Sequence, residues 1–369
     1  MGLITRAAVC REPGAPWEIA DLELDDPGPS EVRVRFMAAG LCRSDDHVQK
    51  GAAAMRMPVV GGHEGAGIVD AVGAGVTRAA AGDHVVCSFV PACGTCRYCS
   101  TGRQNLCEAG GNAATGALPD GTFRFHANGT DLGGLCVLGT FSRYAVVPET
   151  QVIGIPDDVP FDVAAMVSCG VPTGWGSAVY VAGVRAGDTV VIYGAGGVGS
   201  NAVQGASHAG AKHVVVVDPV PFKREMAEAF GATDAFADAA AAREFVVAAT
   251  GGDLADHAII TVGELDDEVI EHALGIVGRN GQVTITAVGG GMLDAGPGLF
   301  IGFQRRVQGA VYGGCNPRHD VPRLLGLYRS GHIKLDELIT RRYRLDEINQ
   351  GYQDMLDGKN IRGVIIHEH

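Results

Sequence analysis

Apolar and polar positions divide the chain into stretches with two different patterns. Up to about residue 155, short segments such as Val32–Phe36 alternate apolar and charged residues and are interrupted by glycine and proline, which is typical of β-strands joined by turns. From about residue 188, apolar runs alternate with amphipathic segments, which predicts β-strands alternating with α-helices and therefore a parallel sheet. Mixed structure returns from about residue 314, with a helical pattern at 321–328 and a final apolar run at 362–367.

These patterns predict an α/β protein with two domains. A doubly wound parallel-sheet domain is expected over 171–313, inserted into a β-rich domain formed by 1–170 and 314–369. The elements expected in the inserted domain are strands and helices in turn: strand 189–193, helix 200–206, strand 213–217, helix 222–230 ending at Gly231, strand 258–262, helix 266–277 and strand 283–287.

A glycine-rich turn at 194–199 connects the first of these strands to the following helix. Gly194 permits a sharp turn, Gly196 lets the backbone approach a pyrophosphate, and Gly199 lets helix and strand pack closely. The N-terminus of the helix offers free N–H groups to the phosphates. Asp218 follows the next strand, where it would accept hydrogen bonds from an adenosine ribose and repel a 2′-phosphate. The pattern therefore predicts binding of NAD rather than NADP.

Composition narrows the class of protein. A net charge of -13 and a pI near 5.3 argue against nucleic acid or an anionic membrane as the main partner. The uncharged stretch Val163–Val184 contains Pro172 and four glycines, which favours buried turns over a membrane helix. No secretory signal is recognisable, so the sequence predicts a cytoplasmic protein whose ten cysteines are metal ligands or free thiols rather than disulfides.

Four cysteines lie close together in a turn-rich segment. Cys93, Cys96, Cys99 and Cys107 have the spacing C-x2-C-x2-C-x7-C, and four thiolates can close a tetrahedral zinc site with no open position. An iron–sulfur centre is the rival interpretation. The bacterial ferredoxin run, however, has three residues before its last cysteine and then proline, whereas here the last gap is longer and Glu108 follows. The spacing thus favours structural zinc.

A second set of metal-binding residue types is dispersed along the chain. Cys42, the pair His63-Glu64, and Cys169 lie in three separate segments. Two cysteines and one histidine, with a fourth position left to water or substrate, form a catalytic zinc pattern. Each residue alone is a weak signal, because isolated buried cysteines and histidines usually belong to the core.

Together with the glycine turn, these segments resemble the zinc-dependent medium-chain alcohol dehydrogenases, and the resemblance covers the whole chain. It implies a GroES-like fold for the β-rich domain and a Rossmann fold for the inserted domain. It also implies that Cys42, His63 and Cys169 bind the catalytic zinc and that Glu64 lies beside it, able to enter the coordination shell. Asp45 matches the carboxylate that orients the histidine ligand.

The same resemblance implies further roles. Ser44 and His47 match a proton relay, and Phe89 matches a residue that gives the substrate pocket an apolar wall. A homo-oligomer is also implied. The cofactor-binding residues that it implies are Arg43, Thr173, Gly194, Gly196, Gly197, Val198, Gly199, Asp218, Lys223, Val288 and Arg362.

Four segments show a closer resemblance within this family. Residues 87–99, 119–126, 217–224 and 349–363 are similar to the actinobacterial nicotinoprotein alcohol dehydrogenases, which are assayed with nitrosodimethylaniline as an artificial acceptor. This resemblance implies an NAD that stays bound between turnovers. It further implies reoxidation in place by an external acceptor, for which mycofactocin is the proposed natural molecule.

The sequence thus predicts a dehydrogenase that oxidises a primary, apolar or aromatic alcohol to its aldehyde, with NAD and two zinc ions. A thiol-dependent formaldehyde dehydrogenase, using glutathione or mycothiol, is one alternative, and an acidic thiol would require basic residues at the pocket mouth. A non-catalytic nucleotide-binding relative is the other. The remaining cysteines are interpreted as small buried hydrophobes: Cys10, Cys87, Cys136 and Cys315.

Overall fold

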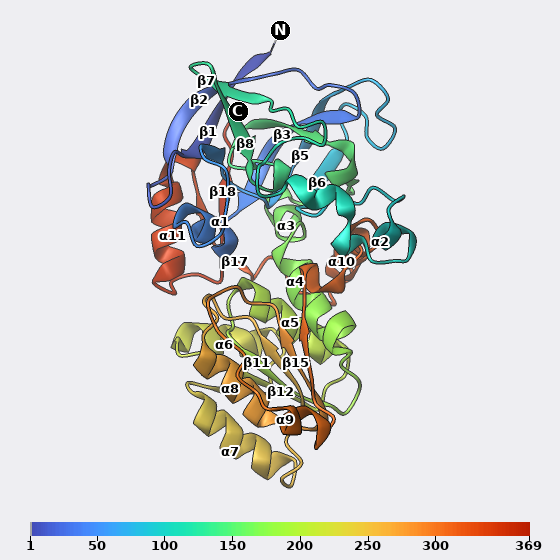
Figure 1. Ribbon diagram of the computed structural model, residues 1–369, viewed down its shortest axis with the longest axis vertical. Coiled ribbons are helices and arrows are strands. Elements are labelled where there is room, and N and C mark those ends of the chain that lie inside the picture. The colour runs from blue at the N-terminus through green and yellow to red at the C-terminus, as the bar shows by residue number, and fades with distance from the viewer. Residues whose placement is uncertain (1) are drawn as a thin grey trace. The chain divides into compact units, whose positions relative to one another are not determined.

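The computed structural model describes residues 2–369, and the chain divides into two compact units. The β-rich unit contains the residues up to Cys169 together with Asn316–Gly331 and Leu335–His369. The α/β unit contains Gly170–Cys315 and His332–Lys334. In Figure 1 the β-rich unit accordingly combines blue ribbon from the start of the chain with red ribbon from its end.

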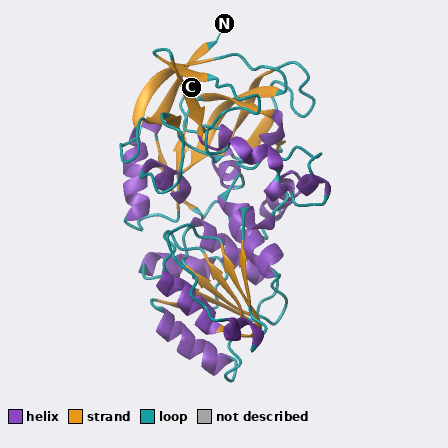
Figure 2. Cartoon of the chain, viewed as in Figure 1, coloured by secondary structure: helices purple, strands orange, loops and turns teal. Residues whose placement is uncertain are grey.

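A closed barrel and a seven-stranded sheet form the β-rich unit (Figure 2). The barrel has the strand order β1 (Leu3–Cys10), β2 (Glu18–Leu24), β7 (Phe125–Ala127), β8 (Thr130–Gly134) and β4 (Val59–Val60). The sheet has the order β10 (Val152–Gly154), β6 (His84–Cys87), β5 (Gly65–Val72), β3 (Glu31–Gly40), β18 (Arg362–Ile366) and β17 (Ile339–Tyr343), with β9 (Tyr144–Pro148) also paired to β3.

The alternation predicted at Val32–Phe36 lies within β3. Its two valines and Phe36 are fully buried, whereas the two arginines between them are half-buried, as expected for a strand with one face on the core. β18 pairs antiparallel with β3, so the final apolar run of the chain joins a sheet that begins near its start. This pairing is how two distant parts of the sequence come to share one hydrophobic core.

The α/β unit contains one six-stranded sheet in which every neighbouring pair is parallel. Figure 2 shows its strands beside the helices that cover them. The order places the glycine-turn strand in the middle, where a doubly wound fold binds its ligand. From edge to edge the strands are β13 (Asp234–Phe236), β12 (His213–Val217), β11 (Thr189–Tyr193), β14 (Ala255–Ile260), β15 (Val277–Ile285) and β16 (Arg306–Gly309).

The helices of the two units differ in number and length. Those of the β-rich unit are α1 (Arg43–Gln49), α2 (Arg97–Ser100), α3 (Phe161–Met166), α10 (Pro317–Arg329) and α11 (Ile348–Leu356). Those of the α/β unit are α4 (Gly170–Gly176), α5 (Gly197–His208), α6 (Pro221–Ala229), α7 (Ala239–Ala249), α8 (Asp267–Ile276) and α9 (Pro297–Ile301).

The uncharged stretch Val163–Val184 is divided among short helices. It contains part of α3, all of α4 and a π-helix at Ser177–Ala182, which ends at Gly183 in a left-handed conformation. Within residues 2–369, no helix is both long enough and apolar enough to cross a bilayer.

Candidate metal centres and cofactor site

Four metal-binding side chains that are far apart in the sequence converge in the β-rich unit. Cys42 directly precedes α1, His63 and Glu64 lie between β4 and β5, and Cys169 follows α3. All four are buried, and their potential ligand atoms lie within 4.8 Å of one another. The structure therefore brings together the dispersed residues that the sequence grouped only by residue type.

This donor set suits a zinc ion. Two thiols, an imidazole and a carboxylate are the ligand types that zinc prefers. The pKa of Cys42 is held well below its usual range, chiefly because the thiol of Cys169 donates a hydrogen bond to it and secondly because His63 lies close. The thiolate is the form of cysteine that binds metal. Glu64 Oε1 is buried and has no hydrogen-bond partner in the part of the chain that the structure describes.

Asp45 faces the Nδ1 nitrogen of His63. Its Oδ1 accepts a hydrogen bond from the Gly62 N–H at 2.9 Å, and its Oδ2 lies 3.2 Å from His63 Nδ1. Burial opposes protonation of His63, but the charges of Asp45 and Cys42 outweigh it and raise the pKa of the imidazole well above its usual value. Since Nδ1 faces Asp45, Nε2 is the nitrogen left for a metal.

Arg362 forms a buried ion pair with Glu64 behind the donor cluster. Burial raises the pKa of Glu64 to about 7, against the lowering effect of Arg362. A side chain at Gly40 would collide with both the Glu64 carboxylate and Met166, so the absence of a side chain there gives the ion pair its space. The resemblance implies a pyrophosphate contact for Arg362. In the structure, only 6% of this residue is exposed.

The expected proton-relay residues both lie on α1. Ser44 is exposed, and its Oγ lies 3.8 Å from Cys42 Sγ, so its hydroxyl borders the donor cluster. His47 is buried one turn further along the helix. Arg43, an expected cofactor residue, is half-buried with its Nε 3.5 Å from Asp46 Oδ2.

The second cluster consists of four thiols and forms around α2. The potential ligand atoms of Cys93, Cys96, Cys99 and Cys107 also lie within 4.8 Å of one another. Cys96 caps α2 by accepting the Cys99 N–H, while Cys93 accepts the Cys96 N–H at 3.4 Å. Burial opposes ionisation of Cys93, but backbone N–H groups of Cys96 and Thr95 outweigh it and lower its pKa to about 6. These thiols fit a closed tetrahedral metal site.

The glycine turn of the α/β unit has the conformation that the sequence predicts. Gly194 has φ +89°, which favours glycine, and a Cβ at Gly199 would collide with the carbonyl oxygen of Gly194. A Cβ at Gly196 would meet no atom within 4 Å, so that side of the turn is open. Gly197 and Val198 begin α5, whose first N–H groups are therefore free to bind phosphate.

Asp218 follows β12 and contacts the glycine turn directly. Its carboxylate accepts hydrogen bonds from the N–H groups of Ala195 and Val220, at 2.8 and 2.9 Å. Each carboxylate oxygen has a second lone pair, so the residue remains able to accept bonds from a ribose. Only 4% of Asp218 is exposed, so the surrounding residues hold its carboxylate in one orientation.

The other expected cofactor residues differ in their surroundings. Lys223 is half-buried on α6, and the hydroxyl of Thr173 on α4 is buried without a hydrogen-bond partner in the described chain. Val288 is 57% exposed after β15, and its carbonyl accepts the Leu265 N–H at 3.1 Å. Among these residues, Thr173 offers a buried hydroxyl with which a cofactor could form a hydrogen bond.

An apolar groove of about 560 Å³ lies within the β-rich unit and includes the expected pocket residue Phe89. The Phe89 ring lies 5.8 Å from the ring of His63, in an edge-on arrangement. Cys136, predicted as a small buried hydrophobe, packs against a core cluster and also lines this groove, where it is half-buried. The backbone of Cys136 has φ +54°. No pattern in the sequence indicated this conformation, so the sequence did not predict that Cys136 lines the groove.

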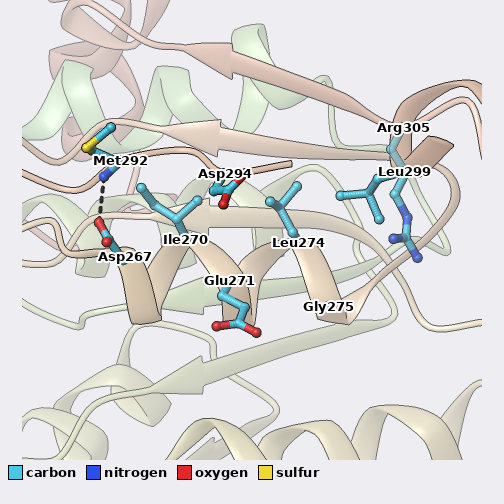
Figure 3. Close-up of a pocket in the computed structure, with 9 residues that line it drawn as sticks. All are labelled: Asp267, Ile270, Glu271, Leu274, Gly275, Met292, Asp294, Leu299 and Arg305. Atoms are coloured by element: carbon cyan, nitrogen blue, oxygen red, sulfur yellow. Dashed lines mark hydrogen bonds between the residues drawn. The ribbon is translucent and has the colours of Figure 1, made fainter. Parts of the chain in front are cut away.

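A cavity of about 500 Å³ lies along α8, in the α/β unit. Figure 3 shows the residues that line it. Apolar side chains of Ile270, Leu274 and Leu299 line it beside three carboxylates and Arg305. At one end, Asp267 accepts a hydrogen bond from the Met292 N–H at 2.6 Å. Among the residues that the structure describes, none of the expected cofactor or metal residues lines this cavity.

Comparison with known proteins agrees with this arrangement. The family model of the alcohol dehydrogenase GroES-like domain matches residues 28–157, and the model of zinc-binding dehydrogenases matches residues 197–330. An NDMA-dependent alcohol dehydrogenase of Amycolatopsis methanolica is 53% identical over 366 residues, covering 98% of this chain and 99% of the relative. Alcohol dehydrogenase B of Mycobacterium tuberculosis is 46% identical, covering 98% of each.

A solved structure shows the same fold. The benzyl alcohol dehydrogenase of Acinetobacter calcoaceticus superposes with a TM-score of 0.91 and 28% sequence identity, covering 99% of this chain and all of that protein. The likeness extends over both units, so it includes the segments that carry the two donor clusters and the glycine turn.

Proposed function

Because the chain belongs to the zinc-dependent medium-chain alcohol dehydrogenases, we propose that it oxidises a primary alcohol with an apolar or aromatic tail to the aldehyde, transferring hydride to NAD. The observation that carries this proposal is the convergence of Cys42, His63 and Cys169 beside an apolar groove. The donor set supports zinc chemistry at this point, and the groove supports a substrate with an apolar tail.

Two zinc ions are proposed for each chain. Cys42, His63 and Cys169 would hold the catalytic ion, with Glu64 beside it, because this mixed set can leave a position open to substrate. The four thiols of the second cluster would hold a structural ion, because they complete a tetrahedron without an open position.

When bound, zinc supplies Lewis acidity to the alcohol oxygen and NAD supplies the hydride acceptor. The chain's own residues prepare this chemistry. Asp45 orients His63 by accepting its Nδ1–H, and the Ser44 hydroxyl beside Cys42 accepts the proton that the alcohol releases. His47, on the same helix, conducts that proton away, which is the role of a positioned imidazole near neutral pH. Phe89 excludes water from the apolar side of the site.

The α/β unit would bind NAD through its glycine turn and Asp218. The open side of Gly196 and the free N–H groups of α5 suit a pyrophosphate, and the carboxylate of Asp218 disfavours a 2′-phosphate. Further contacts are assigned to the remaining expected residues, which are Arg43, Thr173, Gly197, Val198, Lys223, Val288 and Arg362. The Amycolatopsis relative is named for its dependence on NDMA. By analogy, this chain would retain NAD and pass electrons to an external acceptor such as mycofactocin.

The groove also bears on the thiol-dependent alternative. Glutathione carries two carboxylates, so its adduct requires basic side chains nearby. Among the described residues that line the groove, none is a lysine or arginine, and Glu108 is the one charged side chain. An uncharged tail therefore fits it better than an acidic one. The complete donor set and the family membership likewise favour catalysis over a non-catalytic nucleotide-binding relative.

A homo-oligomer is proposed from the edge of the α/β sheet. β16 is an edge strand, and exposed edges and apolar patches are sites of self-association. The apolar residues near it are unusually exposed, with Ile301 at 82%, Met292 at 75% and Val311 at 50%. The variant Ile301→Asp is expected to lower the molar mass measured by light scattering, whereas the same change at an exposed position on the β-rich unit, Ile4→Asp, should leave it unchanged.

The function is tested by the absorbance spectrum of desalted protein together with its metal content. A nicotinamide band that survives desalting, increases when an alcohol is added and disappears with nitrosodimethylaniline would support a retained NAD. Activity only with added NAD would support an ordinary dehydrogenase. Absence of alcohol oxidation under both conditions, in protein that holds zinc, would contradict the proposed function.

A further inference from the structure

A tyrosine of the β-rich unit is buried beside the carboxylate that faces His63. Tyr352 on α11 is 3% exposed, and its hydroxyl oxygen has no hydrogen-bond partner of regular geometry among the described residues. The same is true of Asp45 Oδ2, which lies 3.2 Å from His63 Nδ1. Buried polar atoms without partners cost free energy, so a hydrogen bond that satisfied both oxygens would be favourable.

The Tyr352 hydroxyl lies close enough to Asp45 to interact with it. Burial raises the pKa of Tyr352 well above its usual value, and the charges of Asp45 and Cys42 and hydrogen bonding to Asp45 raise it further. The phenol therefore keeps its proton near neutral pH and can donate it to a hydrogen bond. Because an ionised carboxylate can only accept, the two groups are complementary.

Aromatic neighbours hold the ring of Tyr352 in place. The ring stacks on Trp17, with the two ring centroids 6.1 Å apart, and meets Phe141 edge-on at 6.3 Å. Phe141 in turn donates its backbone N–H to the carbonyl oxygen of Gly61 at 2.9 Å. Gly61 lies two residues before His63, so one aromatic cluster supports both the tyrosine and the segment that carries the histidine.

The helix that carries Tyr352 also packs against the segment that carries Cys42. A Cβ at Gly351 would lie only 2.5 Å from Leu41 Cδ1, so α11 and this segment leave no space for a side chain between them. Leu41 directly precedes Cys42, and its N–H donates to the carbonyl oxygen of Gly363 at 2.9 Å. Backbone packing therefore determines where the Tyr352 hydroxyl lies relative to Cys42.

From these contacts, and resting on the proposed function, we propose that Tyr352 is a positioning residue of the catalytic zinc site: its hydroxyl donates to Asp45 Oδ2 and fixes the carboxylate that orients His63. The Gly62 N–H bonds to the other oxygen, Oδ1. A carboxylate held at one oxygen can still turn about its Cβ–Cγ bond, whereas a donor at each oxygen fixes its plane. Tyr352 thus acts on the metal through Asp45 and His63.

The variant Tyr352→Phe tests this role because it removes only the hydroxyl oxygen. It should release the catalytic zinc to a chelator about fivefold faster than the unaltered protein, because one hydrogen bond to the carboxylate is lost while the bond from Gly62 remains. The phase of zinc release that is absent from Cys42→Ala identifies this ion. In zinc-saturated Tyr352→Phe, kcat should fall while KM is unchanged, because a metal ligand rather than substrate binding is affected.

Tyr343→Phe is the matched control. Tyr343 is another buried tyrosine of the same unit, 7% exposed, and its hydroxyl donates to Asp354 Oδ2 at 2.9 Å. Removing this hydroxyl also deletes a buried bond from a tyrosine to an aspartate, so the melting temperature should fall. The rate of zinc release should equal that of the unaltered protein, because Asp354 supports no metal ligand.

A double-mutant cycle separates positioning from packing. In Asp45→Asn the charge that Tyr352 would hold is gone, so adding Tyr352→Phe should change the rate of zinc release by less than about twofold. The full effect of Tyr352→Phe in that background, or no effect of Tyr352→Phe in the unaltered protein, would overturn the proposal. Failure of the unaltered, zinc-loaded protein to oxidise alcohols would contradict the proposed function instead, and the rates of zinc release would still decide the role of Tyr352.

Discussion

The β-rich unit holds two sets of four donor side chains that are assembled in opposite ways. The four thiols of Cys93, Cys96, Cys99 and Cys107 come from one short segment, and backbone N–H groups of that segment bond to their sulfurs. The mixed set of Cys42, His63, Glu64 and Cys169 comes from separate segments and is buried throughout. The first set is a local structure and the second is a product of the fold.

This difference has consequences for what each set can do. A local loop can order itself around an ion and can therefore rely on that ion for its shape. The dispersed set is held by the surrounding protein, with Asp45 behind His63 and Arg362 behind Glu64. Such support fixes ligands even when one coordination position is left open, which catalysis requires.

The largest expected effect is the loss of a donor from the dispersed set. Cys42→Ala should lower kcat by at least about a thousandfold, because Lewis-acid stabilisation of several kcal/mol is lost. The fold should survive, since the segments around Cys42 are held by the sheet. Steady-state kinetics and zinc analysis provide the measurement, and Cys10→Ala, a buried cysteine outside both sets, is the matched control. Near-normal turnover in zinc-depleted Cys42→Ala would show that this set is not the catalytic centre.

Loss of a donor from the local set should instead affect stability. Cys99→Ser is expected to release one ion and to cost about 3 kcal/mol of unfolding free energy, because the loop loses the ion that orders it. Limited proteolysis should then cut within residues 94–107. The neighbouring Ser100→Ala removes only an exposed hydroxyl that bonds to Arg97, so it should behave like the unaltered protein. An unchanged melting temperature together with an unchanged protease pattern would argue against a structural ion there.

A smaller effect is expected when the support of a ligand is removed but the ligand remains. Asp45→Asn keeps the oxygen that accepts the Gly62 N–H but removes the charge facing His63. Loss of a partner of this kind lowers metal affinity by about 10–100-fold. Competition with a chelator measures it. Asp46→Asn, next in sequence and paired with Lys50 instead, should retain the affinity. If both variants hold the ion equally well, Asp45 does not support His63.

The smallest expected effect is a loss of folding stability in acid. It has to be measured before any loss of metal at low pH is interpreted. Burial lowers the pKa of His367 to about 4, although its Nε2 bonds to the Thr140 carbonyl oxygen. The unfolded chain therefore binds the proton first as pH falls below about 6.5, and the folded state loses about 2 kcal/mol between about pH 7 and pH 5. Urea unfolding of His367→Gln, which keeps a donor for Thr140, should show a correspondingly weaker pH dependence. An identical pH profile in both proteins would exclude His367 as the source.

The α/β unit could be predicted from the sequence in more detail than the β-rich unit. The strands expected at 189–193 and 213–217 are β11 and β12 with the same bounds, and Gly231 follows α6 in a left-handed conformation. Fully buried parallel strands are continuous apolar runs, so their limits are visible. The prediction missed α7, β13 and β16, where alanine-rich or half-buried residues give no clear period. The strand predicted at 258–262 extends two residues too far, because β14 ends at Ile260.

The candidate sites also differ in how far they could be predicted from the sequence. The spacing of the four thiols and of the glycine turn was sufficient to predict both, because each site is built within one segment. Cys136 and Leu106 could not be assigned to the groove from the sequence, because no periodicity relates them and Cys136 itself has a left-handed backbone conformation. Their proximity exists only after the strands have paired.

The sequence by itself therefore determined the α/β order, the thiol loop and the turn at 194–199, since each depends on interactions between residues close together in the chain. Tertiary structure alone decided that Cys42, His63 and Cys169 share one buried point and that the thiol loop faces Phe89. The physical reason is that side chains from distant segments meet only where sheet register and core packing place them. No local pattern carries that information.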